Sequence, residues 1–340
     1  MPLPRDFFRP QSEQTFTESR RPVHRLTLGL AGLAALAVLA GLAGLAVSDE
    51  AGPTPARRSL AAVQDRYAGR LPDPPQTGEL AVYAGAPGEP ALDCAALSQG
   101  RTMVALVFGQ SNASNTVDPG YESVRPVYAF ADGVCTKARD ALPGATGTKG
   151  SSWPRLGDKL IAGGFYDAVI FANIARGGSS ILEWGPGGRH NAVLLASLDA
   201  LAKAGLPPTH VLLHQGEADC ALGVAAPDYA AMLDAVIAQI QSKVGPETDV
   251  VVARTSQYFD LVCGDAANPA CFKTCPALTQ AQTAAADPKR HVLSGPDTDR
   301  LVPFAERNDG YHFTAQAADR FADAWLPQLS RSEAAARRLQ

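Results

Sequence analysis

The sequence has no excess of basic residues. Its 340 residues include 30 Lys and Arg against 34 Asp and Glu, a formal net charge of -4, and the basic residues are scattered along the chain. Binding to a nucleic-acid backbone needs a basic patch or stripe, because every phosphate carries a negative charge. We therefore expect no nucleic-acid partner. With 46% hydrophobic residues, the chain can bury the core of one large domain or of two ordinary ones.

Cysteines with the spacing of zinc ligands are also missing. The six cysteines do not form paired C-x2-C units, and the densest cluster, CGDAANPACFKTC (263–275), contains no histidine. These spacings disfavour a metal site, so we expect no metal and no other cofactor. All six cysteines follow the hydrophobic segment described next, where an oxidising compartment would let them pair. We expect disulfides, with Cys94–Cys135 as one of them.

One long hydrophobic run is present near the N-terminus. Residues 26–47 (LTLGLAGLAALAVLAGLAGLAV) carry no charge, and a helix of this length crosses a bilayer core of roughly 30 Å. Arg20, Arg21 and Arg25 lie close before the run, and Asp49 and Glu50 follow it, which favours a cytoplasmic tail over residues 1–25. We expect an uncleaved single-pass anchor, with the rest of the chain on the periplasmic or extracellular side. A signal peptide cleaved near residues 44–46 is the alternative, and it would give a secreted protein.

The remainder divides by composition into three parts. Residues 48–92 are rich in Pro, Gly, Ala and charge, as in a tether, and residues 331–340 form a short C-terminal tail. Between them, residues 93–330 alternate short apolar runs with helical patterns. The predicted strands are 103–108, 167–175, 210–215, 249–256 and, more weakly, 291–294; the predicted helices are 191–205, 227–245 and 314–329. Continuous apolar strands alternating with helices predict a three-layer α/β/α sandwich on a parallel sheet, with ligands at the carboxyl ends of the strands.

One serine and one Asp-x-x-His turn stand where such a sheet would present them. Ser111 follows the first predicted strand directly, in VALVFGQSN, where its hydroxyl could act as a nucleophile. A serine nucleophile needs a base and a carboxylate that orients the base. In NDGYHFT, Asp309 precedes His312 by three residues, so one loop can place both side chains on the same side. Read singly, the serine is an ordinary helix cap and the tetrapeptide an Asx-turn.

Two further segments at predicted strand ends could donate hydrogen bonds to an oxyanion. ARGGSSILEW contains Gly177 and Gly178, whose backbone N–H groups could face a ligand, and LLHQGEAD contains the Gln215 amide. Such donors are needed for acyl transfer, in which negative charge develops on the carbonyl oxygen. Read singly, the glycines form a plain turn and the amide is satisfied at a strand end.

Read together, the four segments resemble the successive sequence blocks of the SGNH hydrolases. They are similar in particular to the branch of sialate O-acetylesterases and acetylxylan esterases. The blocks appear in the family's order between residues 102 and 326, and they are GQSN (109–112), GGSSI (177–181) with Trp184, HQGEAD (214–219) and DGYH (309–312). The resemblance implies a flavodoxin-like SGNH hydrolase fold for the domain at 93–330.

The resemblance also implies a role for each residue of the site. Ser111 would be the nucleophile, His312 the base that later protonates the leaving alcohol, and Asp309 the carboxylate that orients it. The oxyanion hole would consist of the backbone N–H groups of Ser111 and Gly178 and the side chain of Gln215.

Asn112 and Trp184 are the expected substrate-binding residues. Trp184 would offer its face to a sugar ring, unless it is simply buried, and Trp153 and Tyr311 are weaker candidates for the same platform. The acidic residues of the third block, Glu217 and Asp219, are expected to brace their loop rather than to react. The cysteine-bearing insertion at 261–275 is expected at the rim of the cleft.

The function implied by the resemblance is that of an exported, membrane-tethered serine esterase. It would remove O-acetyl groups from a carbohydrate through an acyl-enzyme, so the expected partner is an acetylated glycan. Three other interpretations use the same residues or fold: an O-acyltransferase, a lipid or thioester hydrolase, and a non-catalytic glycan-binding domain.

Overall fold

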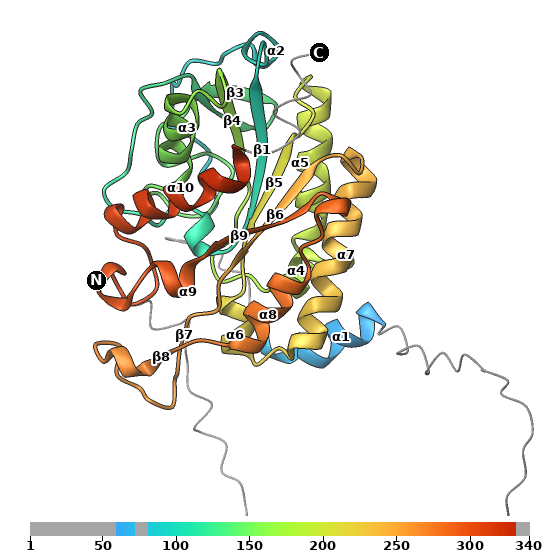
Figure 1. Cartoon of the computed structure of the whole chain (residues 1–340), viewed down its shortest axis with the longest axis vertical. Helices are drawn as coiled ribbons and strands as arrows, with labels where there is room; N and C mark the ends of the chain where they lie inside the picture. Colours follow the sequence, from blue (N-terminus) through green and yellow to red (C-terminus); the bar gives the residue numbers. More distant parts are fainter. Residues whose placement is uncertain (1–58, 72–80, 331–340) are drawn as a thin grey trace, which may run out of the picture. The chain divides into compact units, whose positions relative to one another are not determined.

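A seven-stranded sheet forms the centre of the computed structural model, which describes residues 59–71 and 81–330. The strands lie in the order β3-β2-β4-β1-β5-β6-β9 (Figure 1). Their bounds are β1 (Thr102–Gly109), β2 (Val127–Ala131), β3 (Val134–Lys137), β4 (Ala168–Asn173), β5 (His210–His214), β6 (Asp249–Arg254) and β9 (Val292–Asp297). The five predicted strands are thus confirmed, and β1, buried along its whole length, lies between β4 and β5.

The sheet is mixed rather than wholly parallel. The pairs from β2 across to β9 are parallel, but β3 is antiparallel to β2 and forms one edge. The prediction of a purely parallel sheet was therefore wrong at this edge. The turn between β2 and β3 contains Asp132 and Gly133, both with positive φ, and an Asp-Gly pair is a common hairpin signal. Short strands with half-exposed side chains hid this hairpin from the hydrophobic pattern.

Helices cover both faces of the sheet, as the three-layer prediction requires. Their bounds are α1 (Leu60–Tyr67), α2 (Cys94–Leu97), α3 (Trp153–Ala162), α4 (Ile181–Trp184), α5 (Asn191–Lys203), α6 (Glu217–Leu222), α7 (Ala226–Val244), α8 (Pro276–Ala284), α9 (Thr298–Leu301) and α10 (Ala315–Leu329). In Figure 1, α3 and α10 lie on one side of the sheet and α5 and α7 on the other. Side chains alternate along β1, so Val104, Leu106 and Phe108 pack toward α5 and α7 while the intervening residues pack toward α3 and α10. Thr314 caps α10, as the sequence suggested.

The predicted tether at 48–92 is partly docked on the domain. Val63 and Tyr67, four residues apart on α1, are buried, and the Tyr67 hydroxyl donates to Asp228 of α7 at 2.9 Å. Leu92 pairs with Cys135 next to β3. These contacts correct the prediction, because they make α1 and the residues before α2 part of the same compact unit as the sheet.

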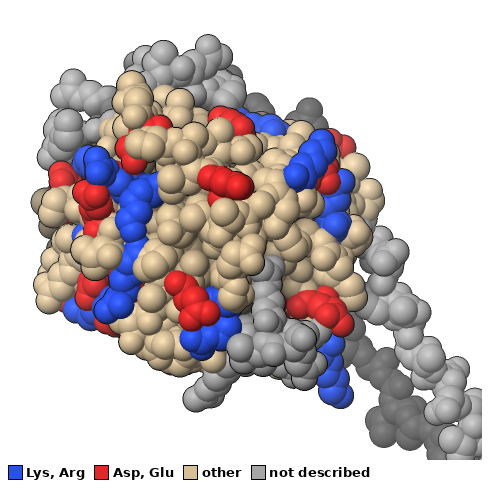
Figure 2. Space-filling model, turned by 90° about the horizontal axis from the view of Figure 1, so that it is seen from above, with Lys and Arg blue, Asp and Glu red and all other residues tan. Residues whose placement is uncertain are grey.

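The expected membrane anchor at 26–47 lies outside the described residues, as do the tails at 1–25 and 331–340. Among the residues that the structure describes, no helix combines the length and the apolar character needed to cross a bilayer. On the face drawn in Figure 2, Lys and Arg side chains lie among Asp and Glu rather than in a region of their own.

All six cysteines form disulfides, as expected. The pairs are Cys94–Cys135, which was predicted, Cys220–Cys275 and Cys263–Cys271. The last closes an insertion that contains the short strands β7 (Tyr258–Phe259) and β8 (Phe272–Lys273), paired antiparallel. We call residues 258–275 the cysteine hairpin. Cys220–Cys275 joins its end to α6, directly after β5.

Candidate active site

Ser111 leaves the sheet abruptly at the carboxyl end of β1. Gly109 has φ +130°, and a Cβ there would lie 2.1 Å from the carbonyl oxygen of His214 on β5, so only glycine allows the two strands to approach here. The N–H of Gln110 donates to that same carbonyl at 3.1 Å. Residues 111–113 then form one turn of 3-10 helix. The fully buried strand β1 thus ends just before Ser111, and the serine lies past the carboxyl end of the sheet.

Asp309 and His312 lie side by side in one loop, as the spacing of the Asp-x-x-His turn predicted. His312 Nδ1 lies 2.6 Å from Asp309 Oδ2, and Asp309 Oδ1 accepts the backbone N–H groups of Tyr311 and His312 at 2.9 and 2.8 Å. Burial alone would raise the pKa of Asp309, but the hydrogen bonds and charge from His312 and the two N–H groups outweigh it and lower the pKa to about 2. The carboxylate is therefore charged at neutral pH and holds Nδ1, so that Nε2 is the nitrogen left for a reaction.

Asn112 brings the serine turn and the histidine loop together. Its Nδ2 donates to the carbonyl of Tyr311 and to Glu217 Oε1, both at 3.2 Å, and its Oδ1 accepts the N–H of Phe313 at 3.2 Å. The side chain is 3% exposed. Asn112 is therefore a clamp between loops, and the expectation that it contacts substrate was wrong, because all its polar atoms are used inside the protein.

Two backbone N–H groups remain available beside the serine. Arg176 N and Ser179 Oγ both donate to the carbonyl of Gly109, at 2.9 and 3.0 Å, which holds the GGSS segment against the end of β1. Gly178, between them, has φ +70°. Within the described part of the chain, neither the N–H of Gly178 nor that of Ser111 donates to a protein acceptor, and Ser111 Oγ makes no hydrogen bond.

Gln215 does not offer its amide to an open site. The side chain is fully buried, and its Nε2 donates to the carbonyl of Ser179 at 3.1 Å and to Asp219. Both hydrogens of the amide nitrogen are thus used. The expected oxyanion donor is instead a brace between the second and third sequence blocks.

Asp219 lies at the centre of that brace. Its Oδ1 accepts the hydroxyl of Ser180 at 2.7 Å and its Oδ2 the N–H of Ile181 at 3.1 Å. Complete burial raises the pKa of Asp219 to about 7, although these hydrogen bonds and the one from Gln215 oppose the shift. The expected bracing by the third block therefore reaches across to the second block.

Trp184 is a core residue and not a stacking platform. It is 0% exposed, packs edge-on against Phe108 at 5.2 Å between ring centroids, and donates its Nε1–H to Ser179 Oγ at 2.8 Å. Its four-residue helix α4 begins with a capping box between Ser180 and Glu183. Trp153 is equally buried, whereas Tyr311 is half-buried.

Two arginines near the site were missed by sequence reasoning. Arg307 is 5% exposed and donates from Nη1 to the carbonyl of Tyr311 at 2.8 Å, which supports the histidine loop. Arg176 donates from Nη1 to the carbonyls of Gly144 and Ile174 at 2.7 and 2.8 Å. Burial lowers the pKa of Arg176, and no carboxylate of the described residues pairs with it. Its position directly before the two glycines was the only available signal.

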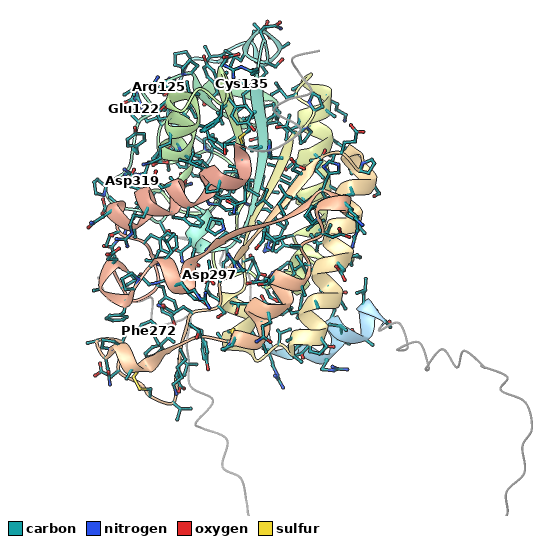
Figure 3. All side chains as sticks on the ribbon, in the orientation of Figure 1. Glu122, Arg125, Cys135, Phe272, Asp297 and Asp319 are labelled. Carbon is teal, nitrogen blue, oxygen red and sulfur yellow. A yellow bond between two sulfur atoms is a disulfide. The ribbon has the colours of Figure 1, made fainter. Side chains whose placement is uncertain are left out.

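The cysteine hairpin packs on the loop that carries His312. The ring of Phe272 lies 5.2 Å from that of Tyr311, and the N–H of Phe259 donates to the Tyr311 hydroxyl at 3.1 Å. Gln257, just before the hairpin, donates to the carbonyl of Gly310 at 2.8 Å. Figure 3 shows Phe272 on the segment below α9 and β9. The insertion thus supports the histidine loop from the outside.

Metal ligands do not gather in the part of the chain that the structure describes: it contains no group of three or more His, Cys, Asp and Glu side chains arranged to hold a metal ion.

Residues 159–326 match the family described as carbohydrate esterase, sialic acid-specific acetylesterase. The matched region contains the second, third and fourth sequence blocks. Ser111 precedes it and joins the other blocks through the contacts of Asn112 described above. A search of curated protein sequences finds no match.

Among solved structures, a protein from Arabidopsis thaliana is similar with a TM-score of 0.51 at 15% identity, over 68% of this chain and 98% of that one. This similarity supports the same fold. A carbohydrate acetylesterase from Xanthomonas citri has a TM-score of 0.42 at 17% identity, over 68% of this chain and 57% of that one. A lipase/acylhydrolase from Enterococcus faecalis has a TM-score of 0.43 at 11% identity, over 67% of this chain and 95% of that one.

Proposed function

The chain is an SGNH hydrolase of the carbohydrate esterase type, a carboxylic ester hydrolase, and from this premise we propose that it removes O-acetyl groups from a glycan through an acyl-enzyme on Ser111. The observation that carries the proposal is the junction at Asn112. It bonds the serine turn to the loop in which His312 and Asp309 lie 2.6 Å apart. The turn that carries Ser111 and the loop that carries Asp309 and His312 are thus bonded to each other, which supports assigning to them the three residue types that acyl transfer requires.

The reaction follows from the positions of these groups. Ser111 Oγ attacks the acetyl carbonyl while its proton passes to His312 Nε2, and Asp309 stabilises the imidazolium that forms. The backbone N–H groups of Ser111 and Gly178 bind the oxyanion of the tetrahedral intermediate. The intermediate collapses when His312 returns the proton to the leaving sugar hydroxyl. Water then attacks the acetyl-enzyme with His312 as base, which releases acetate and regenerates the serine.

The substrate in this proposal is an acetylated sugar. Trp184 and Asn112 are buried and do not take part in sugar binding, so the surface residues around the serine remain for that role. Arg176, a half-buried guanidinium without a carboxylate partner among the described residues, supports including acidic sugars among the candidates, because a guanidinium binds carboxylate well.

The location in this proposal is the outer side of a membrane. Three disulfides and no free cysteine support an oxidising compartment. The uncharged run at 26–47 supports an anchor, and the folded part of the protein then begins by residue 59 rather than at residue 93.

Acetate release tests the proposal directly. The full chain in detergent would be assayed on acetylated sialic acids, acetylated xylo-oligosaccharides and cell-wall fragments, with Ser111→Ala alongside. Ser98→Ala, at the C-cap of α2 and outside the site, is the matched control. We expect release from at least one substrate, lost by a factor of about 10³ or more in Ser111→Ala and unchanged in the control.

Either of two results would count against esterase function. Turnover that persists in a folded Ser111→Ala variant would exclude the mechanism. A serine that reacts with an organophosphate but releases no acetate from any substrate would indicate transfer to another acceptor, or a different acyl group.

A further inference from the structure

We propose that Asp219 is a positioning residue for the oxyanion hole, whose carboxylate fixes the GGSS segment so that the Gly178 N–H faces the developing oxyanion. The inference rests on the proposed function, because it takes Gly178 as an oxyanion donor. Asp219 would touch neither substrate nor reacting atoms, and it would act through Ser180, Ile181 and Gln215.

The carboxylate holds the segment from its C-terminal side. Asp219 accepts the Ser180 hydroxyl at 2.7 Å, the Ile181 N–H at 3.1 Å and the Gln215 amide. Asp219, Ser180 and Gln215 are all 0% exposed. Hydrogen bonds among buried groups that water cannot reach are strengthened by the low local dielectric, and they leave the bonded groups little freedom.

The residues on both sides of Gly178 are also fixed by hydrogen bonds. Ser179 Oγ donates to the Gly109 carbonyl at 3.0 Å and accepts the Trp184 Nε1–H at 2.8 Å. The carbonyl of Ser179 accepts from Gln215 at 3.1 Å. Arg176 N fixes the segment on the other side, again on the Gly109 carbonyl. Among these bonded groups, the Gly178 N–H is left without a protein acceptor.

A carboxylate in this position is costly to the fold. Burial raises the pKa of Asp219 to about 7, and the nearby carboxylate of Glu183 adds to the shift. A neutral side chain of similar shape would avoid the cost of burying a charge. Ionisable groups kept in unfavourable surroundings gather at functional sites, and the loop that Asp219 holds is the one that carries the free N–H.

A role in positioning the donor predicts a specific kinetic signature. The oxyanion exists only in the tetrahedral stages, so a misplaced Gly178 N–H should slow the chemical step and leave substrate binding nearly unchanged. A residue that only stabilises the fold should instead reduce the amount of active protein at high temperature and leave the kcat of the folded fraction unchanged.

The test measures kcat and KM of the full chain carrying Asp219→Asn, Ser180→Ala or Ser180→Thr, on an acetylated substrate from which the wild type releases acetate in the assay described above. The matched control is Asp228→Asn, another fully buried carboxylate, which binds Tyr67 and Arg66 of α1. We expect kcat to fall about 10- to 100-fold in Asp219→Asn and less in Ser180→Ala, with KM within about twofold of wild type. Ser180→Thr keeps the hydroxyl and should restore most of the rate. Asp228→Asn should lower the unfolding temperature only.

A second readout does not depend on the sugar. Diethyl 4-nitrophenyl phosphate reacts with a serine nucleophile through its P=O group, whose oxygen would occupy the oxyanion position as 4-nitrophenolate leaves. The rate of nitrophenolate release should fall in Asp219→Asn by a factor similar to that in kcat.

Several results would overturn the inference. It fails if folded Asp219→Asn keeps the wild-type kcat, or if KM rises while kcat is unchanged. Should Asp219→Asn not fold, equal kcat values for wild type, Ser180→Ala and Ser180→Thr would have the same meaning. The proposed function fails separately, through turnover in Ser111→Ala.

Discussion

The two sides of the site are held by different physical means. On the oxyanion side, the polar atoms of Ser180, Gln215 and Asp219 bond to one another with no exposure to solvent. On the histidine side, Asp309 and His312 keep about a quarter of their side-chain surface exposed, at 25% and 27%. A hydrogen-bond donor for an oxyanion is most effective when buried neighbours fix its position, whereas a general base that exchanges protons with alcohol and water must remain accessible to them.

The largest expected effect on the two sides of the site is that of substituting His312, the proposed base. His312→Ala should lower kcat/KM by a factor on the order of 10⁴, because it removes the base proposed to take the serine proton. His291 offers a matched control. Its Nδ1 lies 2.9 Å from Asp249 Oδ1, but this pair lies at the amino ends of β6 and β9, whereas Ser111 follows the carboxyl end of β1. His291→Ala should leave acetate release unchanged. Equal losses of acetate-release activity in His312→Ala and His291→Ala would show that both Asp–His pairs act only by stabilising the fold.

Trp184 tests the rigidity of the oxyanion side. Trp184→Ala removes a fully buried indole from between Phe108 and His190, and we expect the free energy of unfolding to fall by about 3–5 kcal/mol. Urea unfolding monitored by circular dichroism would measure it. Tyr311→Ala, in the half-buried histidine loop, should cost less. A stable Trp184→Ala variant with a raised KM for glycan would restore the stacking role that burial argues against.

The two aspartates should give opposite trends of stability with pH. The pKa of Asp309 is lowered to about 2 from 3.8, so it stabilises the fold above pH 4 by about 2 kcal/mol, and this is lost as the pH falls through 2. The pKa of Asp219 is raised to about 7 from 3.8. The folded state therefore holds a proton that the unfolded chain has released, and the stability linked to Asp219 is lost as the pH rises from 4 to 7.

Unfolding of wild type, Asp309→Asn and Asp219→Asn across pH 2 to 8 would separate these contributions. The difference between wild type and Asp309→Asn should grow between pH 2 and 4. Wild type should lose stability relative to Asp219→Asn between pH 4 and 7. Parallel curves for all three proteins would contradict both assignments.

The smallest expected effect is at the cysteine hairpin. Phe272→Ala removes the ring that packs on Tyr311 and Phe304, and we expect kcat to fall about tenfold through looser placement of His312. Phe272→Leu, which keeps most of the apolar contact, is the control and should retain more activity. An unchanged kcat in Phe272→Ala would mean that Arg307 and the Asp309 hydrogen bonds hold the loop without the hairpin.

Residues whose positions depend on a strand end or on a local turn could be predicted from the sequence. Gly109, Ser111, Asp309 and His312 take their predicted positions because strand ends and a local turn determine them. The strand and helix order followed from the apolar pattern. The β2–β3 hairpin escaped because its strands are short and only partly buried, although Asp132-Gly133 was a usable signal.

The errors concern exposure and partners, which depend on packing between distant segments. Trp184 and Asn112 were placed in contact with substrate, but each is covered by residues far away in the sequence. Gln215 has the right chemistry for an oxyanion donor, yet Asp219 and Ser179 use its amide. No local sequence pattern predicts the hydrogen-bond partners of a buried amide such as that of Gln215. The partners of the buried Arg307 side chain could not be predicted for the same reason.

The place of β1 in the sheet has a consequence for how the protein is made. Thr102 pairs with Ala168 on one side, and Ala105 with His210 on the other, so the strand that leads to Ser111 cannot be flanked until roughly a hundred further residues have emerged. High contact order slows folding. During synthesis the apolar residues of this central strand therefore stay without both neighbouring strands for an extended period, in which they can aggregate with other chains.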